Sequence, residues 1–244
     1  MILAAGLGTR LRPWTLEHPK ALVPVAGVPM LERVIVSLRS QGFDYIVINV
    51  HHFASQIIEY LASKDFGIRI VVSDESGKLL DTGGGILHAK ELLAIDPSPF
   101  LVHNVDILSS ANLNELMQSH REDNLATLLV SERDSSRRLI FDKTLDLLAW
   151  HNIKEDIYKP SNFKYSSDFK SYAFSGIYVL SIDALNLMTD ERYPEKFPIM
   201  DFFLDNVGSK RIKGYCDDTL RLIDIGKPET LSRANDLLIS ANQI

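Results

Sequence analysis

Short apolar runs alternate with helical patterns of apolar residues along most of the chain. Tyr45 to Val50 is a continuous apolar run, which is typical of a strand buried on both faces. Between Pro29 and Gly42, apolar residues recur at helical spacing, with proline suited to the opening position and glycine to the end. Such alternation favours βαβ units. It predicts an α/β, Rossmann-like fold with a mixed, mainly parallel sheet and helices on both faces.

The other predicted elements continue this alternation. Further strands are expected at Met1–Ala4, Ile68–Val72 and Phe100–His103, and near residues 126–131, 172–180 and 219–224. Further helices are expected around Ile57 to Leu61, from the glycines at 83–85, and near residues 112–122, 198–206 and 228–241. These helices are enough to cover both faces of the predicted sheet.

One region departs from this rhythm. The pattern from Arg138 to Trp150 indicates a β-ribbon that turns at Asp142 and Lys143, and the segment from His151 to Ser171 is polar and irregular. A loop of this length inside a compact domain is usually mobile or functional. We therefore expect a single domain over residues 1–244, with a β-ribbon and a flexible insertion around 138–171, of which residues 151–171 form a solvated flap.

Length and composition are those of a soluble globular protein with one sizeable domain. The 244 residues suit one α/β domain, and contents of 45% hydrophobic and 24% charged residues are typical of a globular protein. No apolar run approaches the ~20 residues that cross a bilayer. The apolar start lacks a basic leader, so we expect no signal peptide and a cytoplasmic location.

The net charge and the cysteine content argue against several kinds of partner and site. A net charge of −6 argues against a nucleic-acid partner, because phosphate backbones favour clustered lysine and arginine. A nucleotide substrate stays open, since a few local cations suffice for one triphosphate. The single cysteine, Cys216, can form neither an internal disulfide nor a metal cluster of cysteines.

The segment from Leu3 to Pro13 carries the strongest chemical signal. Gly6 and Gly8 follow the first predicted strand and let the backbone turn tightly, so that successive N–H groups can point at phosphate oxygens. Arg10 adds a fork-shaped cation suited to the outer phosphates of a nucleotide. Lys20 supplies a second positive charge near the α-phosphate.

Three other interpretations of this segment compete. A Rossmann dinucleotide loop requires glycine where Leu11 stands and a helix that Pro13 interrupts. A Walker loop requires a Gly-Lys-Ser/Thr sequence that the segment lacks. An ordinary glycine turn explains the two glycines alone, but not their combination with Arg10, Pro13 and Lys20. These residues together favour a phosphate-binding loop of another kind.

In combination, these motifs resemble the signature of the sugar-1-phosphate nucleotidylyltransferases. The signature residues run from Leu3-Ala-Ala-Gly-Leu-Gly-Thr-Arg-Leu-Arg-Pro13 to Pro19-Lys20-Ala-Leu-Val-Pro-Val25. The resemblance extends over nearly the whole chain through Leu80–Ile86, Val102–Asp106, Phe174–Tyr178 and Ile223–Gly226. The Asp-Thr-Gly-Gly-Gly-Ile and Phe-Ser-Gly-Ile patterns are most similar to the N-acetylmuramate 1-phosphate uridylyltransferase branch, which implies a role in peptidoglycan recycling.

The resemblance implies an in-line displacement at the α-phosphorus that needs Mg²⁺ and cations but no general base. It assigns Asp106 and Asp224 to the metal, and Arg10, Lys20 and Asp106 to catalysis. Each aspartate follows a predicted strand, and the carboxyl ends of parallel strands share one edge of a sheet, so the two are expected to meet there. For either aspartate alone, capping or turn formation is the commoner explanation.

The resemblance also places the substrates. Nucleotide contacts are expected from Ala4, Ala5, Gly6, Gly8, Thr9, Arg10, Lys20, Asp81, Thr82, Gly83 and Gly84, and sugar contacts from Asn104, Ser175, Gly176 and Lys196. The residues alone leave alternatives open, with Thr82 as a helix cap and Lys196 as a solvated surface lysine. Val105 stands where the family usually has glycine, so its β-branched side chain bears on acceptor specificity.

The leading hypothesis is therefore transfer of a uridylyl group from UTP to a sugar 1-phosphate, with N-acetylmuramate 1-phosphate as the acceptor. One alternative is a GTP-dependent guanylyltransferase that acts on mannose or heptose 1-phosphate. Another is a non-catalytic nucleotide-sugar sensor, which the metal pair disfavours. The expected partners are an NTP, a sugar 1-phosphate and Mg²⁺, with no nucleic acid or membrane, in a monomer or weak homo-oligomer.

Overall fold

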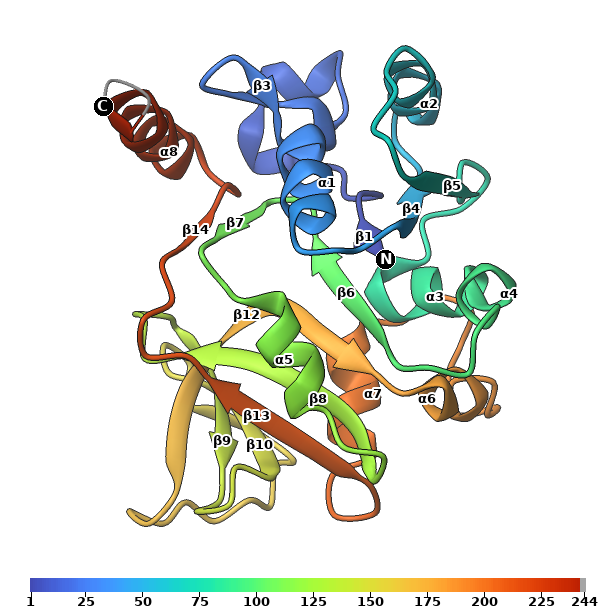
Figure 1. The fold of residues 1–244 in the computed structure, drawn as a ribbon. Coiled ribbons are helices and arrows are strands. Elements are labelled where there is room, and N and C mark those ends of the chain that lie inside the picture. The colour runs from blue at the N-terminus through green and yellow to red at the C-terminus, as the bar shows by residue number, and fades with distance from the viewer. Residues whose placement is uncertain (242–244) are drawn as a thin grey trace.

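A computed structural model describes residues 1–241, and its centre is four parallel strands in the order β6–β1–β4–β5 (Figure 1). These strands are β1 (Ile2–Leu3), β4 (Tyr45–Val50), β5 (Arg69–Asp74) and β6 (Phe100–Asn104). β1 is paired on both sides, with Ile2 beside Ile48 of β4 and His103 of β6. All four strands were expected from the apolar runs.

Side chains that alternate along the central strands supply two apolar cores, one on each face of the sheet. Ile2 joins one core and its neighbour Leu3 joins the other. In β4, Ile46 and Ile48 share the core of Ile2, whereas Val47 shares that of Leu3. The sequence pattern of a strand buried on both faces is thereby confirmed.

Helices cover both faces, as predicted. The core of Ile2 is closed by α1 (Met30–Ser40), α2 (Ala54–Ala62) and α5 (Leu113–Ser119). The core of Leu3 is closed by α3 (Asp81–His88), α4 (Lys90–Leu93), α6 (Ile182–Leu187) and α7 (Ile199–Asp205). Within residues 1–241, none of the helices combines the length and apolar character that crossing a membrane requires.

The other half of the ten-stranded sheet is largely antiparallel and is organised around β12 (Lys170–Leu180). β12 pairs antiparallel with β6, β8 and β9, and β9 continues into β10 and β11. The strands are β8 (Asn124–Ser131), β9 (Arg137–Phe141), β10 (Leu147–Asn152), β11 (Ile157–Lys159) and β13 (Arg211–Cys216), the last parallel to β8. The sheet is therefore mixed with a parallel centre, and the predicted fold class is confirmed.

The prediction that residues 219–224 form a strand of this sheet is wrong. Only β14 (Leu222–Asp224) is extended there, and it pairs antiparallel with β7 (Ile107–Ser109) in a separate two-stranded sheet. The main sheet instead takes β13, whose apolar positions are interrupted by polar ones and were not recognised. A turn separates the two strands, in which Asp217 Oδ1 accepts hydrogen bonds from Thr219.

The C-terminal helix α8 (Pro228–Ala241) packs on the segment that follows β1 (Figure 1). Leu11, Met30, Ile225 and Ala234 belong to one apolar cluster between them. This N-terminal segment contains the 3-10 helices Thr9–Leu11, Trp14–Leu16 and Lys20–Leu22 and the strands β2 (Pro24–Val25) and β3 (Val28–Pro29). The two ends of the described chain thus support each other.

Packing in α3 generates a stability prediction. A Cβ at Gly84 would stand 2.3 Å from the backbone oxygen of Glu195, so Gly84→Ala is expected to lower the free energy of unfolding by about 1–3 kcal/mol through overpacking. In an unconstrained helix alanine would instead gain up to about 1 kcal/mol. Gly77→Ala is the control, because no atom lies within 4 Å of its Cβ position. Urea denaturation compares the variants, and an unchanged or more stable Gly84→Ala would contradict the packing.

Candidate active site

The loop after β1 is shaped by its contact with the segment that carries Lys20. Gly8 has a φ of +63°, and a Cβ there would lie 2.8 Å from Lys20 Cβ and 2.9 Å from Thr15 Cγ2, so glycine is required. Thr15 Oγ1 also donates to Gly8 O at 2.9 Å. Among the described residues, the N–H groups of Gly6, Leu7 and Gly8 have no protein acceptor. The loop therefore presents free backbone donors suited to phosphate oxygens.

Asp106 and Asp224 are brought to one place by the pairing of β7 with β14. Asp224 stands opposite Ile107 in the register, and Ile225 N donates to Asp106 O at 2.8 Å. Asp106 follows β6, so it lies at the carboxyl edge of the parallel strands, as expected. Asp224 reaches the same place for a different reason than expected, because β14 runs along β7 and is not a parallel strand of the main sheet.

Positive side chains adjoin the two carboxylates. Lys20 is 9% exposed, and its Nζ forms an ion pair with Asp106 Oδ2. Arg10 Nη2 and Asp224 Oδ1 both lie against Gly226, 2.9 and 2.8 Å from the position that a Cβ would take there. The pKa of the Asp224 carboxyl is raised, first by burial and then by the charge of Asp106, while Lys20 and Arg10 oppose that shift. The two carboxylates therefore still repel each other.

The oxygens of the two aspartates fit a hard dication such as Mg²⁺. Positive charge between them would stabilise the ionised carboxyl of Asp224, whose pKa is raised first by burial and then by the charge of Asp106. Mg²⁺ commonly takes one or two carboxylates and completes its shell with water and substrate phosphates. Two carboxylates are therefore sufficient, although the described chain contains no group of three or more His, Cys, Asp or Glu residues placed to bind a metal.

A cavity of about 260 Å³ opens between the phosphate loop and the start of α3. It is lined by Leu3, Ala5, Gly6, Lys20, Asn49, Leu79, Asp81, Thr82, Asn104, Val105 and Asp106. Asn49 is fixed there because its side chain accepts from Ala4 N at 2.7 Å and donates to Glu75 Oε1 at 2.8 Å. Val105, expected to bear on the acceptor, lines this cavity and is 4% exposed. The space joins the phosphate loop to Asp106, which suits a nucleotide.

The glycines of α3 serve close packing within the protein. The N–H groups of Gly83 and Gly84 donate to Phe197 O at 2.9 and 3.2 Å, and a Cβ at Gly83 would stand 2.3 Å from the Phe197 ring. Bare backbone at these two positions therefore faces the loop before α7. Thr82 does act as a cap, but of α7, since its Oγ1 accepts from Ile199 N at 2.8 Å.

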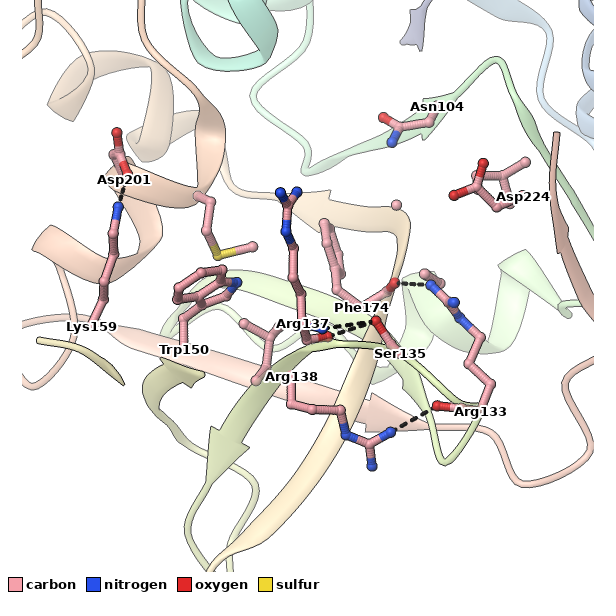
Figure 2. A pocket seen from close by; sticks show the side chains of 15 residues that line it. Asn104, Arg133, Ser135, Arg137, Arg138, Trp150, Lys159, Phe174, Asp201 and Asp224 are labelled. Atoms are coloured by element: carbon pink, nitrogen blue, oxygen red, sulfur yellow. Dashed lines mark hydrogen bonds and ion pairs between the residues drawn. The ribbon is translucent and has the colours of Figure 1, made fainter. Parts of the chain in front are cut away.

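A second cavity, of about 460 Å³, has Asn104 and Asp224 in its lining (Figure 2). Its lining comprises Asn104, Ile107, Arg133, Ser135, Arg137, Arg138, Leu139, Trp150, Lys159, Phe174, Ser175, Gly176, Met200, Asp201 and Asp224. Gly176 has a φ of +78°, and a Cβ there would stand 2.6 Å from Asn104 Nδ2. The side chain that approaches Gly176 closely is thus that of Asn104, which lines both cavities.

The structure gathers most of the expected site residues around these two cavities. The smaller one is lined by Ala5, Gly6, Lys20, Asp81, Thr82, Asn104 and Asp106, and the larger by Asn104, Ser175, Gly176 and Asp224. Neither lining includes Ala4, Gly8, Thr9, Arg10, Gly83, Gly84 or Lys196. Lys196 is exposed in the loop before α7, consistent with the alternative of a surface lysine.

Sequence reasoning missed the basic wall of the larger cavity. Arg133 follows β8, Arg137 begins β9, and Trp150 stands on β10 opposite Leu139 of β9. The sequence signal that could have revealed this wall is the alternation of side chains along β9. It places Arg137 and Leu139 on the same face of the ribbon. Lys159, from the irregular segment after the ribbon, also lines this cavity.

The fold and this site define a class, the nucleotide-diphospho-sugar transferases. The protein HddC from Yersinia pseudotuberculosis has a TM-score of 0.77 and 26% identity, with 97% of each chain covered. A UDP-glucose pyrophosphorylase solved with UDP-glucose has a TM-score of 0.76 over 98% of this chain and 97% of that chain. Its identity is 18%, so this second likeness concerns the fold alone.

The chain belongs to the nucleotidyl transferase family, whose profile matches residues 1–240. It is 44% identical over 109 residues to the N-acetylmuramate alpha-1-phosphate uridylyltransferase of Caulobacter vibrioides, a match that covers 43% of this chain and 44% of that protein. It is 29% identical over 249 residues to the mannose-1-phosphate guanyltransferase of Yarrowia lipolytica, covering 99% of this chain and 64% of that protein. The chain thus spans less than two thirds of the length of these relatives.

The raised pKa of Asp224 gives a test that needs no substrate. Because folding disfavours the charged carboxyl, Asp224→Asn is expected to raise the melting temperature of the metal-free protein at pH 7. The gain should shrink as the pH falls through the raised folded-state pKa and vanish below the ordinary value of 3.8, where the carboxyl is neutral in both states. Thermal unfolding across this pH range measures the effect. A variant that melts below the wild type at pH 7 would contradict the inference that burial and the charge of Asp106 disfavour the ionised carboxyl of Asp224.

Proposed function

We propose that this protein transfers a nucleotidyl group from a nucleoside triphosphate to a sugar 1-phosphate and releases pyrophosphate. The observation that carries the proposal is the position of Asp106 and Asp224 at the junction of two cavities. One cavity opens on the phosphate loop and the other on a basic ribbon, and Asn104 lines both. A transfer between two substrates requires that their reacting groups meet at such a junction.

In the proposed reaction, a phosphate oxygen of the acceptor attacks the α-phosphorus of the triphosphate. A new bond forms between that oxygen and the α-phosphorus as the bond to the pyrophosphate oxygen breaks, and pyrophosphate leaves with the electron pair. The attacking oxygen is already ionised at neutral pH, so no general base is required. The chain contributes alignment of the two substrates and neutralisation of their charge.

The surrounding residues fit these roles. Free N–H groups of the phosphate loop, with Arg10, would hold the outer phosphates, and Lys20 would stabilise the α-phosphate beside Asp106. Arg133 would bind the acceptor phosphate, since it lines the larger cavity and its charge acts on Asp224. Mg²⁺ held by Asp106 and Asp224 would stabilise the charge that develops at the α-phosphorus.

For the substrates we favour UTP and N-acetylmuramate 1-phosphate. The support is the similarity to the Caulobacter vibrioides uridylyltransferase, whose identity is higher than that of the guanyltransferases. These substrates would give the protein a part in the cytoplasmic recycling of cell-wall sugars.

A guanylyl transfer is the second candidate. The Yarrowia lipolytica guanyltransferase matches nearly the whole chain, and HddC from Yersinia pseudotuberculosis has been solved with GMP-PN. The reaction chemistry and the carboxylate pair would be the same, with GTP as donor and mannose or heptose 1-phosphate as acceptor. A non-catalytic sensor would bind nucleotide sugars without turning over either pair.

Replacement of the carboxylates tests the reaction class. Asp106→Asn and Asp224→Asn are each expected to lower Mg²⁺-dependent pyrophosphate release by about 100-fold or more, with circular dichroism spectra that show a retained fold. Asp44→Asn is the matched control, because Asp44 is exposed and precedes β4 at the opposite edge of the parallel strands. Undiminished turnover in both active-site variants would refute the metal assignment.

A substrate panel identifies the reacting pair. UTP, GTP, CTP and dTTP are each combined with the 1-phosphates of N-acetylmuramate, N-acetylglucosamine, mannose and heptose, and pyrophosphate is measured. We expect the highest kcat/KM for UTP with N-acetylmuramate 1-phosphate. A maximum with GTP and mannose or heptose 1-phosphate would establish the guanylyl alternative, and nucleotide-sugar binding without any turnover would establish the sensor.

A further inference from the structure

Most charged side chains in the larger cavity already have partners. Lys159 Nζ pairs with Asp201 at 3.6 Å and lies 5.8 Å from the centre of the Trp150 ring. Arg138 Nη1 donates to Arg133 O at 2.7 Å, and its Nη2 donates to Ser171 O. Lys159 thus has an acidic neighbour, and Arg138 is engaged in holding the ribbon.

The guanidinium of Arg133 is only partly engaged. Its Nη2 donates to Phe174 O at 2.8 Å, whereas its Nε is buried without a hydrogen-bond partner. Figure 2 shows its guanidinium on the side of the cavity that carries Asp224. In the proposed function, this is the side where the acceptor phosphate meets the nucleotide.

Arg137 differs from these residues, because its guanidinium has no hydrogen-bond or ion-pair partner among the described residues. Its backbone is fixed by Ser135, whose Oγ donates to Arg137 O at 2.9 Å and accepts from Arg137 N at 3.2 Å. The side chain extends into the cavity from the ribbon, beside Trp150 (Figure 2). An unpaired, always-charged and solvent-exposed fork thus lies in the cavity between Trp150 and the end that carries Asn104 and Asp224 (Figure 2).

We infer that Arg137 selects acceptors that carry a carboxylate in addition to the 1-phosphate. This inference rests on the proposed function. With the 1-phosphate beside Asp106, Asp224 and Arg133, the sugar ring extends toward Arg137. A carboxylate on the ring can accept two parallel hydrogen bonds from the guanidinium, which a hydroxyl cannot match in charge or geometry. N-acetylmuramate differs from N-acetylglucosamine only by a lactyl ether that carries such a carboxylate.

The two 1-phosphates therefore form a matched substrate pair for the test. In the wild type, kcat/KM should be higher for N-acetylmuramate 1-phosphate than for N-acetylglucosamine 1-phosphate. Arg137→Gln should reduce the ratio of the two values by about 10- to 100-fold, the usual effect of losing a hydrogen bond between charged groups. Arg137→Lys should restore part of the ratio, because it keeps the charge without the fork. The loss should appear mainly in KM for the carboxylate acceptor.

Arg121→Gln is the control, since Arg121 is exposed and lines a different cavity, and its ratio should equal that of the wild type. A ratio in Arg137→Gln equal to that of the wild type would overturn the inference. So would a wild type that uses both acceptors equally. Thermal-shift titration with each 1-phosphate measures the same preference as binding. If no combination of triphosphate and sugar 1-phosphate were turned over, the proposed function would be refuted. The ratio of the two affinities from thermal shift, compared between the wild type and Arg137→Gln, would still test the role of Arg137.

Discussion

The antiparallel pairing of β7 with β14 is the contact on which the site depends. It joins the strand after Asp106 to the strand that ends at Asp224, so two carboxylates distant in sequence share one position. Ile225, directly after this strand, packs in the cluster that also contains Leu11 and Ala234. Because of this packing, α8 supports the phosphate loop and the second carboxylate together. The C-terminal end of the chain is therefore part of the site's framework.

Holding like charges together costs free energy, and the surrounding residues explain how the site tolerates it. Lys20 pairs with Asp106, and the charges of Arg10 and Arg133 act on Asp224, yet the pKa of Asp224 stays raised. Burial and the charge of Asp106 both disfavour the ionised carboxylate of Asp224, so a dication bound between the two aspartates would stabilise it. The same arrangement leaves the carboxylate pair between the two cavities, with Asp106 lining the smaller one and Asp224 the larger one.

Features set by local periodicity and short motifs could be predicted from the sequence. The buried run of β4 and the glycine requirement at Gly8 follow from pattern and sterics. Features set by pairing between distant segments could not. Asp224 was expected on a parallel strand and lies on β14, and β13 was missed because polar residues interrupt it. Arg137 was missed because only the fold shows that one face of the ribbon forms a cavity wall. The space at Gly83 is filled by Phe197, a partner remote in sequence.

The most direct test of whether the carboxylate pair binds a metal ion is crystallographic. Crystals grown with Mn²⁺ and a non-hydrolysable analogue of UTP allow the ion to be located by its anomalous scattering. We predict a peak within about 2.1 Å of a carboxylate oxygen of Asp106 and of Asp224, with phosphate oxygens of the analogue completing its shell. A Mn²⁺ ion held by the phosphates alone, away from both aspartates, would contradict the central claim.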